Sequence, residues 1–197
     1  MKYIADTVDF QLEEPTVVTL GKFDGRHRGH QKLLHTMEEL KETLGYATAI
    51  FTFSTAPLSL VTGEAATVIT TSEERRHNME KMGIDYLVEY PFTDDVRKMD
   101  PSVFVKDILV KRMRAKAMVV GPDCSFGYKG AGNVELLRSL SKELGFELYV
   151  IQKEKDHRRD ISSTYIREEL SLGNVAKANE LLGEPYAIHG IVVHGNH

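Results

Sequence analysis

The chain has 197 residues, of which 42% are hydrophobic, and it carries a formal net charge of −4 at pH 7. This length and hydrophobic share are enough for one substantial core, which predicts one α/β domain with a short appendage and argues against two full domains. The slightly negative charge, without long stretches of one sign, argues against a nucleic-acid backbone or an anionic membrane as the main partner.

Cysteine use and the amino terminus indicate the compartment. The single cysteine, Cys124, excludes an internal disulfide and a cysteine-based zinc site, and it fits a reducing cytoplasm. No apolar run approaches the roughly twenty residues of a membrane span, and the first six residues lack the apolar core of a signal peptide. We therefore expect a cytoplasmic protein with neither a membrane nor nucleic acid as partner, while the oligomeric state stays open.

Short apolar runs rich in β-branched residues alternate with helical patterns along the chain. They cover residues 16–20, 47–53, 85–90, 117–120 and 147–151. Buried parallel strands are short and apolar in this way, so the alternation predicts a doubly wound, five-stranded parallel sheet with right-handed crossovers. In such a sheet a ligand binds beyond the carboxyl ends of the strands where the winding reverses. We expect that crevice between the first and fourth of these strands.

Capping residues mark the ends of the predicted helices. A capping box at Thr71-Ser72-Glu73-Glu74 opens a helix that stops at Gly83, and Asp100-Pro101 opens another. In that second helix the residues expected on one apolar face are Phe104, Val105, Ile108 and Leu109. Asn133 is expected to cap a helix that runs to Gly145.

The first predicted strand runs directly into a glycine turn and a helix start that carries two histidines, Gly21-Lys22-Phe23-Asp24-Gly25-Arg26-His27-Arg28-Gly29-His30. A helix start offers unpaired N–H groups and the positive end of the helix dipole, and glycine lets the backbone approach a ligand. His27 and His30, three residues apart, lie on one side of the first turn. This pattern predicts a site for nucleotide phosphates. No third ligand lies at a suitable spacing for a metal, so no protein-held metal is expected.

Two other segments have the composition of binding loops. Residues 121–133, after the fourth predicted strand, are rich in glycine and hold two aromatic residues and a lysine, although an ordinary surface loop has a similar composition. Residues 54–70 show no periodicity and are long for a connection between strand and helix. They fit a mobile flap over the site and an unstructured insertion equally well.

Hydroxyl side chains follow the fifth predicted strand, in Ile161-Ser162-Ser163-Thr164-Tyr165-Ile166-Arg167. Ser162 or Ser163 is expected to cap a helix that runs to Gly173, and Arg167 lies one turn inside it. Hydroxyls, backbone N–H groups and a fixed cation suit a polyphosphate. The alternative is that these serines only cap the helix.

With the histidine segment and the Ser-Ser-Thr segment together, the chain resembles the FMN adenylyltransferase module of the bacterial FAD synthetase family, within the HxGH nucleotidylyltransferase superfamily. The matching stretches are residues 21–30, 119–123, 125–127, 161–167 and 181–186. The resemblance covers nearly the whole chain. It implies a Rossmann-like nucleotidylyltransferase fold and the transfer of AMP from ATP to FMN, with FAD and pyrophosphate as products and Mg²⁺ accompanying ATP.

The resemblance also implies roles for particular residues. The catalytic residues would be His27, His30 and Arg167. ATP would be bound by Gly21, Phe23, Gly25, Gly29, Asp123, Ser163 and Thr164. Location and ring type make Phe53, Phe126 and Tyr128 the candidates for stacking on the flavin.

The chain departs from the family pattern on the flavin side. Cys124 stands where the family has an aromatic residue, and a Pro-His-Pro element is missing near residues 54–57. The family continues into a riboflavin kinase barrel whose first strand would begin near Gly190. We expect residues 1–185 to form the nucleotidylyltransferase domain and residues 186–197 to form a strand or linker toward that barrel.

Two other functions fit the same features. A related nucleotidylyltransferase would use the same phosphate site with another phosphorylated acceptor, such as phosphopantetheine or glycerol phosphate. A catalytically silent module would bind flavin or nucleotide without reaction. Since a fold does not fix a function, an interaction domain is a third and weaker alternative.

Overall fold

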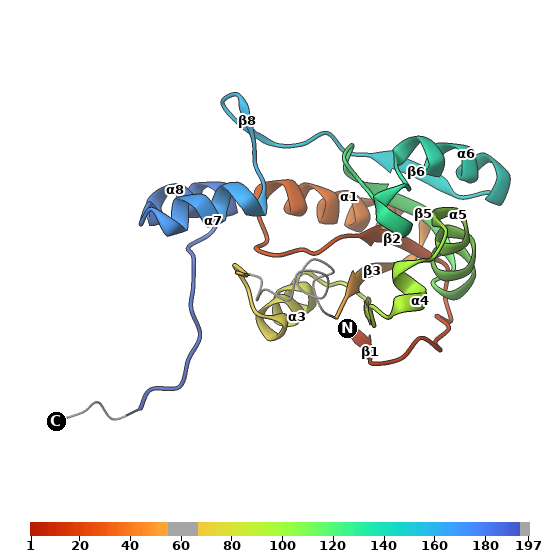
Figure 1. The fold of residues 1–197 in the computed structure, drawn as a ribbon, viewed down its shortest axis with the longest axis horizontal. Helices are drawn as coiled ribbons and strands as arrows, with labels where there is room; N and C mark the ends of the chain where they lie inside the picture. Colours follow the sequence, from red (N-terminus) through yellow and green to blue (C-terminus); the bar gives the residue numbers. More distant parts are fainter. Residues whose placement is uncertain (55–66, 194–197) are drawn as a thin grey trace.

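The computed structural model describes residues 1–54 and 67–193. Within these residues one sheet of six parallel strands forms the centre of the molecule, in the order β1-β4-β3-β2-β5-β6 (Figure 1). The strands are β1 (Lys2–Ala5), β2 (Thr16–Leu20), β3 (Ala47–Phe53), β4 (Tyr86–Tyr90), β5 (Ala115–Val120) and β6 (Glu147–Val150). The chain winds from β2 toward β3 and β4, then returns to the other side of β2 for β5 and β6. The expected reversal between the first and fourth predicted strands is therefore confirmed, at β2 and β5.

The sixth strand, β1, was not predicted from the sequence. It has only four residues, lies at the edge of the sheet beside β4 and is partly exposed, so it lacks the continuous apolar run of a buried strand. Its attachment includes a polar contact, because the Tyr3 hydroxyl donates to Glu89 of β4 at 2.6 Å. The prediction of a parallel sheet was correct, but it gave five strands and omitted the edge strand β1.

The helices of the described residues are α1 (Arg28–Leu44), α3 (Ser72–Lys81), α4 (Asp94–Arg97), α5 (Pro101–Val103), η1 (Phe104–Arg112), η2 (Tyr128–Gly130), α6 (Val134–Leu144), α7 (Ser163–Ser171) and α8 (Val175–Leu182). The four helices for which a capping residue was predicted, α3, α5, α6 and α7, begin at those residues. The capping box of α3 is complete, with Thr71 Oγ1 accepting from Glu74 N at 3.1 Å and Glu74 Oε2 accepting from Thr71 N at 2.8 Å. Asn133 caps α6, and Ser162 rather than Ser163 caps α7.

The helix expected after Asp100 is only partly α-helical. Asp100 caps it and Pro101 stands at its first position, but from Phe104 to Arg112 the backbone is a π-helix. The four residues predicted for its apolar face are nevertheless all buried. A wider helical turn still brings residues four apart close to one side, which is why the apolar pattern did not distinguish the two helices.

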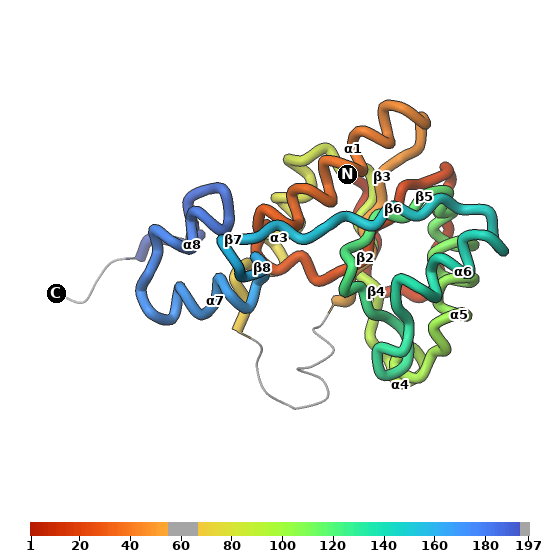
Figure 2. The backbone as a smooth tube through the Cα atoms, turned by 90° about the horizontal axis from the view of Figure 1, so that it is seen from above, coloured from red at the N-terminus to blue at the C-terminus, as the bar shows by residue number. Residues whose placement is uncertain are grey.

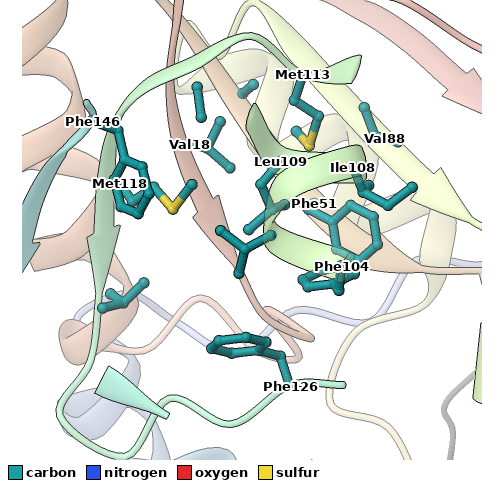
Figure 3. Close-up of a cluster of buried hydrophobic side chains, with 14 of the residues drawn as sticks. Val18, Phe51, Val88, Phe104, Ile108, Leu109, Met113, Met118, Phe126 and Phe146 are labelled. Atoms are coloured by element: carbon teal, nitrogen blue, oxygen red, sulfur yellow. The ribbon is translucent and has the colours of Figure 1, made fainter. Parts of the chain in front are cut away.

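Two apolar cores cover the two faces of the sheet. On one face, Val18, Phe51 and Met118 of the strands pack with Leu109 of η1 and Leu137 of α6 (Figure 3). On the other face, strand residues that include Val17, Ile50 and Val119 pack with Leu34 and Met37 of α1 and with Met79 of α3. The sheet is thus buried from both sides, and nearly all residues of its four inner strands are buried.

A third, smaller core joins α7 to α8, and it includes Ile69, Ile166 and Leu181. This pair of helices lies at the end of the molecule away from α5 and α6 (Figures 1 and 2). An antiparallel hairpin of β7 (Lys155–Asp156) and β8 (Arg159–Asp160) leads from β6 to α7. As a result, Ser163, at the start of α7, reaches the loop that precedes α1.

Leu109 provides a test of the larger core. Its side chain is fully buried, so Leu109→Ala should lower the free energy of unfolding by about 2–5 kcal/mol through lost burial and a residual cavity. The measurement is urea unfolding followed by far-UV circular dichroism. Leu172→Ala is the control, since Leu172 is 72% exposed and its loss should change stability by no more than about 0.5 kcal/mol. Equal effects of the two changes would contradict the burial of Leu109 between η1 and the sheet.

Candidate functional site

The segment after β2 forms a tight loop at the carboxyl end of the sheet. Gly21 N donates to Phe51 O of β3 at 3.1 Å, which continues the sheet by one residue. Phe23 and Gly25 then take left-handed backbone angles, with φ of 49° and 64°. A Cβ atom on Gly25 would lie 2.8 Å from the side chain of Ile69, so only glycine fits there. The Phe23 ring turns inward and is 2% exposed.

His27 and His30 stack on each other at the start of α1. Their ring centroids are 3.7 Å apart with an interplanar angle of 20°, and the Phe23 ring lies 4.8 Å from that of His30. His27 caps the helix, because its Nδ1 accepts from His30 N at 3.3 Å. His30 Nδ1 lies 3.0 Å from Gly25 O. The predicted arrangement of both imidazoles on one side of the first turn is therefore present.

These contacts determine which nitrogen of each ring carries a proton. A backbone N–H only donates, so Nδ1 of His27 is unprotonated and its proton is on Nε2. A carbonyl oxygen only accepts, so Nδ1 of His30 carries its proton. Burial lowers the pKa of His27 to about 3, with a further contribution from His30, and burial lowers the pKa of His30 to about 4 although Gly25 and Asp24 oppose that shift. Both rings are thus neutral at pH 7.

Asp24 connects the histidine loop to two distant segments, and sequence reasoning missed it. Its Oδ1 accepts from Ile69 N at 2.7 Å and from Thr70 N at 3.1 Å, and its Oδ2 accepts from Arg167 Nη1 at 2.6 Å. The sequence did contain a signal for it: a carboxylate in a loop predicted to bind anions needs a cation beside it, which would have pointed to a partner such as Arg167.

The first turn of α7 lies against the same loop. Ser163 Oγ donates to the main-chain oxygen of Asp24 at 2.6 Å, and Arg167 Nη2 donates to Thr164 Oγ1 at 3.4 Å. Gly29 of α1 also packs near the chain at Ile161, since a Cβ on Gly29 would lie 3.9 Å from Ile161 O. The structure therefore brings together the two segments that the sequence singled out, more than 130 residues apart along the chain.

A second charged group lies where β5 and β6 end. Asp123, expected to face ATP, pairs with Lys153 at 2.8 Å, and Lys153 also pairs with Asp160 of the hairpin at 3.3 Å. Lys153 is a further residue of this edge that the sequence did not single out. In the part of the chain that is described, no group of three or more His, Cys, Asp or Glu side chains is placed to hold a metal ion. None of the described helices is long and apolar enough to cross a membrane.

Comparison with known proteins identifies the family. The model of the FAD synthetase family matches residues 9–165. The chain belongs to the FAD synthetase family. Among curated relatives, the bifunctional riboflavin kinase/FMN adenylyltransferase of Escherichia coli strain K12 is 35% identical over 185 residues, which are 93% of this chain and 59% of the relative. That of Listeria monocytogenes is 32% identical over 192 residues, or 96% and 60% of the two chains. This FAD synthetase family member thus spans about three fifths of their length.

Solved structures support the same fold. A crystal structure described as a macrolide-efflux protein from Streptococcus pneumoniae superposes with a TM-score of 0.85 at 28% identity, and the match covers 99% of this chain and 64% of the other. A pantoate-beta-alanine ligase from Francisella tularensis matches at a TM-score of 0.53 and 12% identity, over 86% and 70% of the two chains, which is a likeness of fold alone.

The three aromatic residues considered for flavin contacts of this FAD synthetase family member lie in different surroundings. Phe126 is 7% exposed and packs on Phe104, with ring centroids 5.8 Å apart, so its ring is part of the core. Phe53 stands edge-on to Phe92 at 4.9 Å. Tyr128 is exposed, with Lys129 Nζ 5.3 Å from its ring centroid. Most of residues 54–70, namely 55–66, lie outside the described residues.

The neutral state of the histidine pair predicts how stability depends on pH. An unfolded histidine titrates near 6.5, whereas both folded rings titrate lower, so below pH 6.5 the unfolded chain binds more protons and stability falls. From pH 7.5 to 5.5 the free energy of unfolding should drop by about 1 kcal/mol for each of the two histidines. Urea titrations at several pH values measure this.

His27→Asn is the matched variant, since asparagine also caps helices but does not titrate. It should remove about half of the loss of stability between pH 7.5 and 5.5. A pH dependence identical to that of the unchanged chain would contradict the neutral, buried state of His27.

Proposed function

We propose that this chain transfers AMP from ATP to the phosphate of FMN, with FAD and pyrophosphate as products. The observation that carries the proposal is that Ser163 and Arg167 contact Asp24, in the loop that leads to the stacked histidines, in a chain of the FAD synthetase family. The printed names of the curated relatives, which include FMN adenylyltransferase, agree with this activity.

Transfer of this kind needs alignment and charge compensation rather than a covalent enzyme intermediate. An oxygen of the FMN phosphate attacks the α-phosphorus of ATP, and the bond from that phosphorus to the oxygen bridging toward the β-phosphorus breaks in line. The electron pair of that bond leaves with pyrophosphate, and Mg²⁺ arrives with ATP as part of the substrate. The protein's own groups have to neutralise the charge that develops on the leaving group.

His27, His30 and Arg167 are the groups proposed for that role. His27 has its proton on Nε2 and donates as a neutral ring. His30 uses the proton of Nδ1 for its bond to Gly25 O, so its Nε2 becomes a donor only after taking up a proton, which the negative charge of a bound phosphate favours. Arg167 supplies a permanent cation. The two histidines therefore differ: His27 donates as a neutral ring, and His30 donates from Nε2 only once it is protonated.

Hydroxyls and glycines are proposed to hold ATP around these groups. The Ser163 hydroxyl donates its proton to Asp24 O, so it must give up that bond before it can donate to a phosphate. The Thr164 hydroxyl accepts from Arg167, an interaction that does not use the proton of the hydroxyl. Gly21 and Gly29 are proposed to let the loop backbone approach ATP, whereas Gly25 is buried against Ile69 and shapes the turn. Phe23 packs against His30 from within. Asp123 is proposed to accept from the adenosine, and Phe53 and Tyr128 remain the proposed flavin residues. Phe126 is not proposed to stack on flavin, because its ring is packed on Phe104.

We also propose that residues 1–185 are the catalytic domain and residues 186–197 a connecting segment. The last polar tie to α8 is Tyr186 N donating to Asn179 Oδ1 at 2.7 Å. Beyond it Ile188, Ile191, Val192 and Val193 are all exposed, and the described chain up to residue 193 leads away from α7 and α8 (Figure 1).

The test of the function is an assay of the purified chain with MgATP and FMN, with flavins separated by chromatography. FAD should form, and an ATP analogue with a non-cleavable bridge between the α- and β-phosphorus should give none. Bound but unchanged FMN would favour a silent binding module. Transfer of AMP to phosphopantetheine or glycerol phosphate, without FAD, would favour a related transferase with another acceptor.

His30→Ala tests the histidine pair in the same assay. If His30 acts mainly on the transition state, turnover should fall about a hundredfold to a thousandfold while the far-UV spectrum is unchanged. His35→Ala is the control, because His35 lies on the same helix with its side chain 72% exposed, and its turnover should stay within about twofold of the unchanged chain. Undiminished FAD formation by folded His30→Ala would reject the role given to His30.

A further inference from the structure

The carboxylate of Asp24 occupies a position where an acidic residue is unexpected. Asp24 as a whole residue is 9% exposed, and it lies in the loop whose helix start and cationic neighbour favour bound anions. A buried carboxylate carries a large desolvation cost unless a cation and hydrogen bonds compensate it. Here Arg167 at 2.6 Å and the N–H groups of Ile69 and Thr70 provide that compensation.

Stability alone gives little reason for this arrangement. A buried ion pair contributes little or nothing to stability compared with apolar residues of similar volume, because the desolvation of both charges offsets their attraction. What the pair does provide is geometry. The short contact fixes one edge of the Arg167 guanidinium, and the remaining edge has the Thr164 hydroxyl beside it at 3.4 Å.

The guanidinium is therefore held but not enclosed. The Arg167 side chain is 32% exposed, while that of Asp24 is 12% exposed. Arg167 Nη1 is directed at the carboxylate, and among the described residues only Asp24 and Thr164 accept from the guanidinium, which has further N–H groups to offer a ligand. An arginine that is already oriented loses less conformational entropy when it binds phosphate oxygens.

Asp24 also fixes the chain that leads into α3. Its Oδ1 accepts the N–H groups of Ile69 and Thr70, and Thr70 Oγ1 accepts from Gly25 N at 3.1 Å. Thr71, the next residue, begins the capping box of α3. One carboxylate thus ties together the histidine loop, the entry to α3 and the first turns of α7.

We propose that Asp24 is a positioning residue for adenylyl transfer, which sets the Arg167 guanidinium and the Ile69–Thr70 turn relative to the histidine pair. The proposal rests on the proposed function, in which Arg167 faces the leaving pyrophosphate. Asp24 acts through Arg167 and makes no contact with substrate. Its negative charge also weakens the attraction of the site for ATP, so its value lies in turnover rather than in affinity.

Asp24→Asn separates these effects, because the asparagine oxygen still accepts from Ile69 and Thr70 while the charge that holds Arg167 is lost. Turnover should fall about tenfold to a hundredfold, as expected for a catalytic group displaced by a fraction of an ångström to an ångström. The KM for MgATP should stay the same or decrease, since a negative charge near the phosphates is removed. A general loss of structure would instead raise KM and lower turnover together.

The matched control is Asp94→Asn, which breaks an Asp–Arg pair of 3.0 Å with Arg97 on the exposed surface of α4. Its turnover should stay within about twofold of the unchanged chain. In the background of Arg167→Gln, adding Asp24→Asn should cause no further loss of turnover, because the residue through which Asp24 acts is already gone. Turnover of Asp24→Asn within about twofold of the unchanged chain, or multiplying losses in the double variant, would overturn the proposal.

Two readouts on the full chain do not depend on FAD formation. Amide hydrogen exchange at Ile69 and Thr70 should remain slow in Asp24→Asn and become fast in Asp24→Ala. The Arg167 guanidinium NMR signals should show hindered rotation in the unchanged chain and free rotation in Asp24→Asn. If the unchanged chain makes no FAD, adenylyl transfer fails as a function, while these two readouts still decide the contacts of Asp24. Unchanged exchange in Asp24→Ala, together with unchanged guanidinium rotation in Asp24→Asn, would overturn the positioning role.

Discussion

The parallel pairing of β2 with β3 on one side and with β5 on the other is the constraint on which the site depends. It places the end of β2 at the point where the winding of the sheet reverses, so the loop after β2 has a neighbouring strand end on each side. The apolar residues on both faces of β2 fix this register, because a shift by one residue would exchange the contents of the two cores. The position of the histidines follows from that register.

Polar contacts then assemble the site on this frame. The loop turns back through two left-handed residues, His27 caps α1, and Ser163 and Arg167 attach α7 to the loop. Each contact uses a group that secondary structure leaves free, such as a helix-start N–H or a loop carbonyl. Asp24 is shared by most of them, so the site behaves as one unit and not as independent side chains.

The sequence predicted the buried strands correctly, but it did not predict elements whose structure depends on contacts with distant residues. The strands at 16–20 and 47–53 were predicted with their observed bounds, because short apolar runs rich in β-branched residues strongly favour buried strands. The short edge strand β1 and the π-helical turn of η1 were missed, since neither has a distinctive local pattern.

The same division holds within the site. His27, His30 and Arg167 were expected to meet, and the structure brings the histidine loop and Arg167 together through Asp24. Asp24 itself was not singled out, because a carboxylate in an anion site makes sense only once a residue more than 140 positions away is known to reach it. Phe126 illustrates the converse. An aromatic residue in a glycine-rich loop suits a ligand and a core equally, and only the proximity of Phe104 reveals that its ring is packed.

The uncharged histidines have a consequence for selectivity among small anions. With both imidazoles neutral and Arg167 balanced by a carboxylate, these groups together carry almost no net charge of their own. Inorganic phosphate, abundant in any cell, therefore meets little long-range attraction there. If the proposed function holds, the negative charge of bound ATP would favour protonation of His30 and so add a second cation near Arg167.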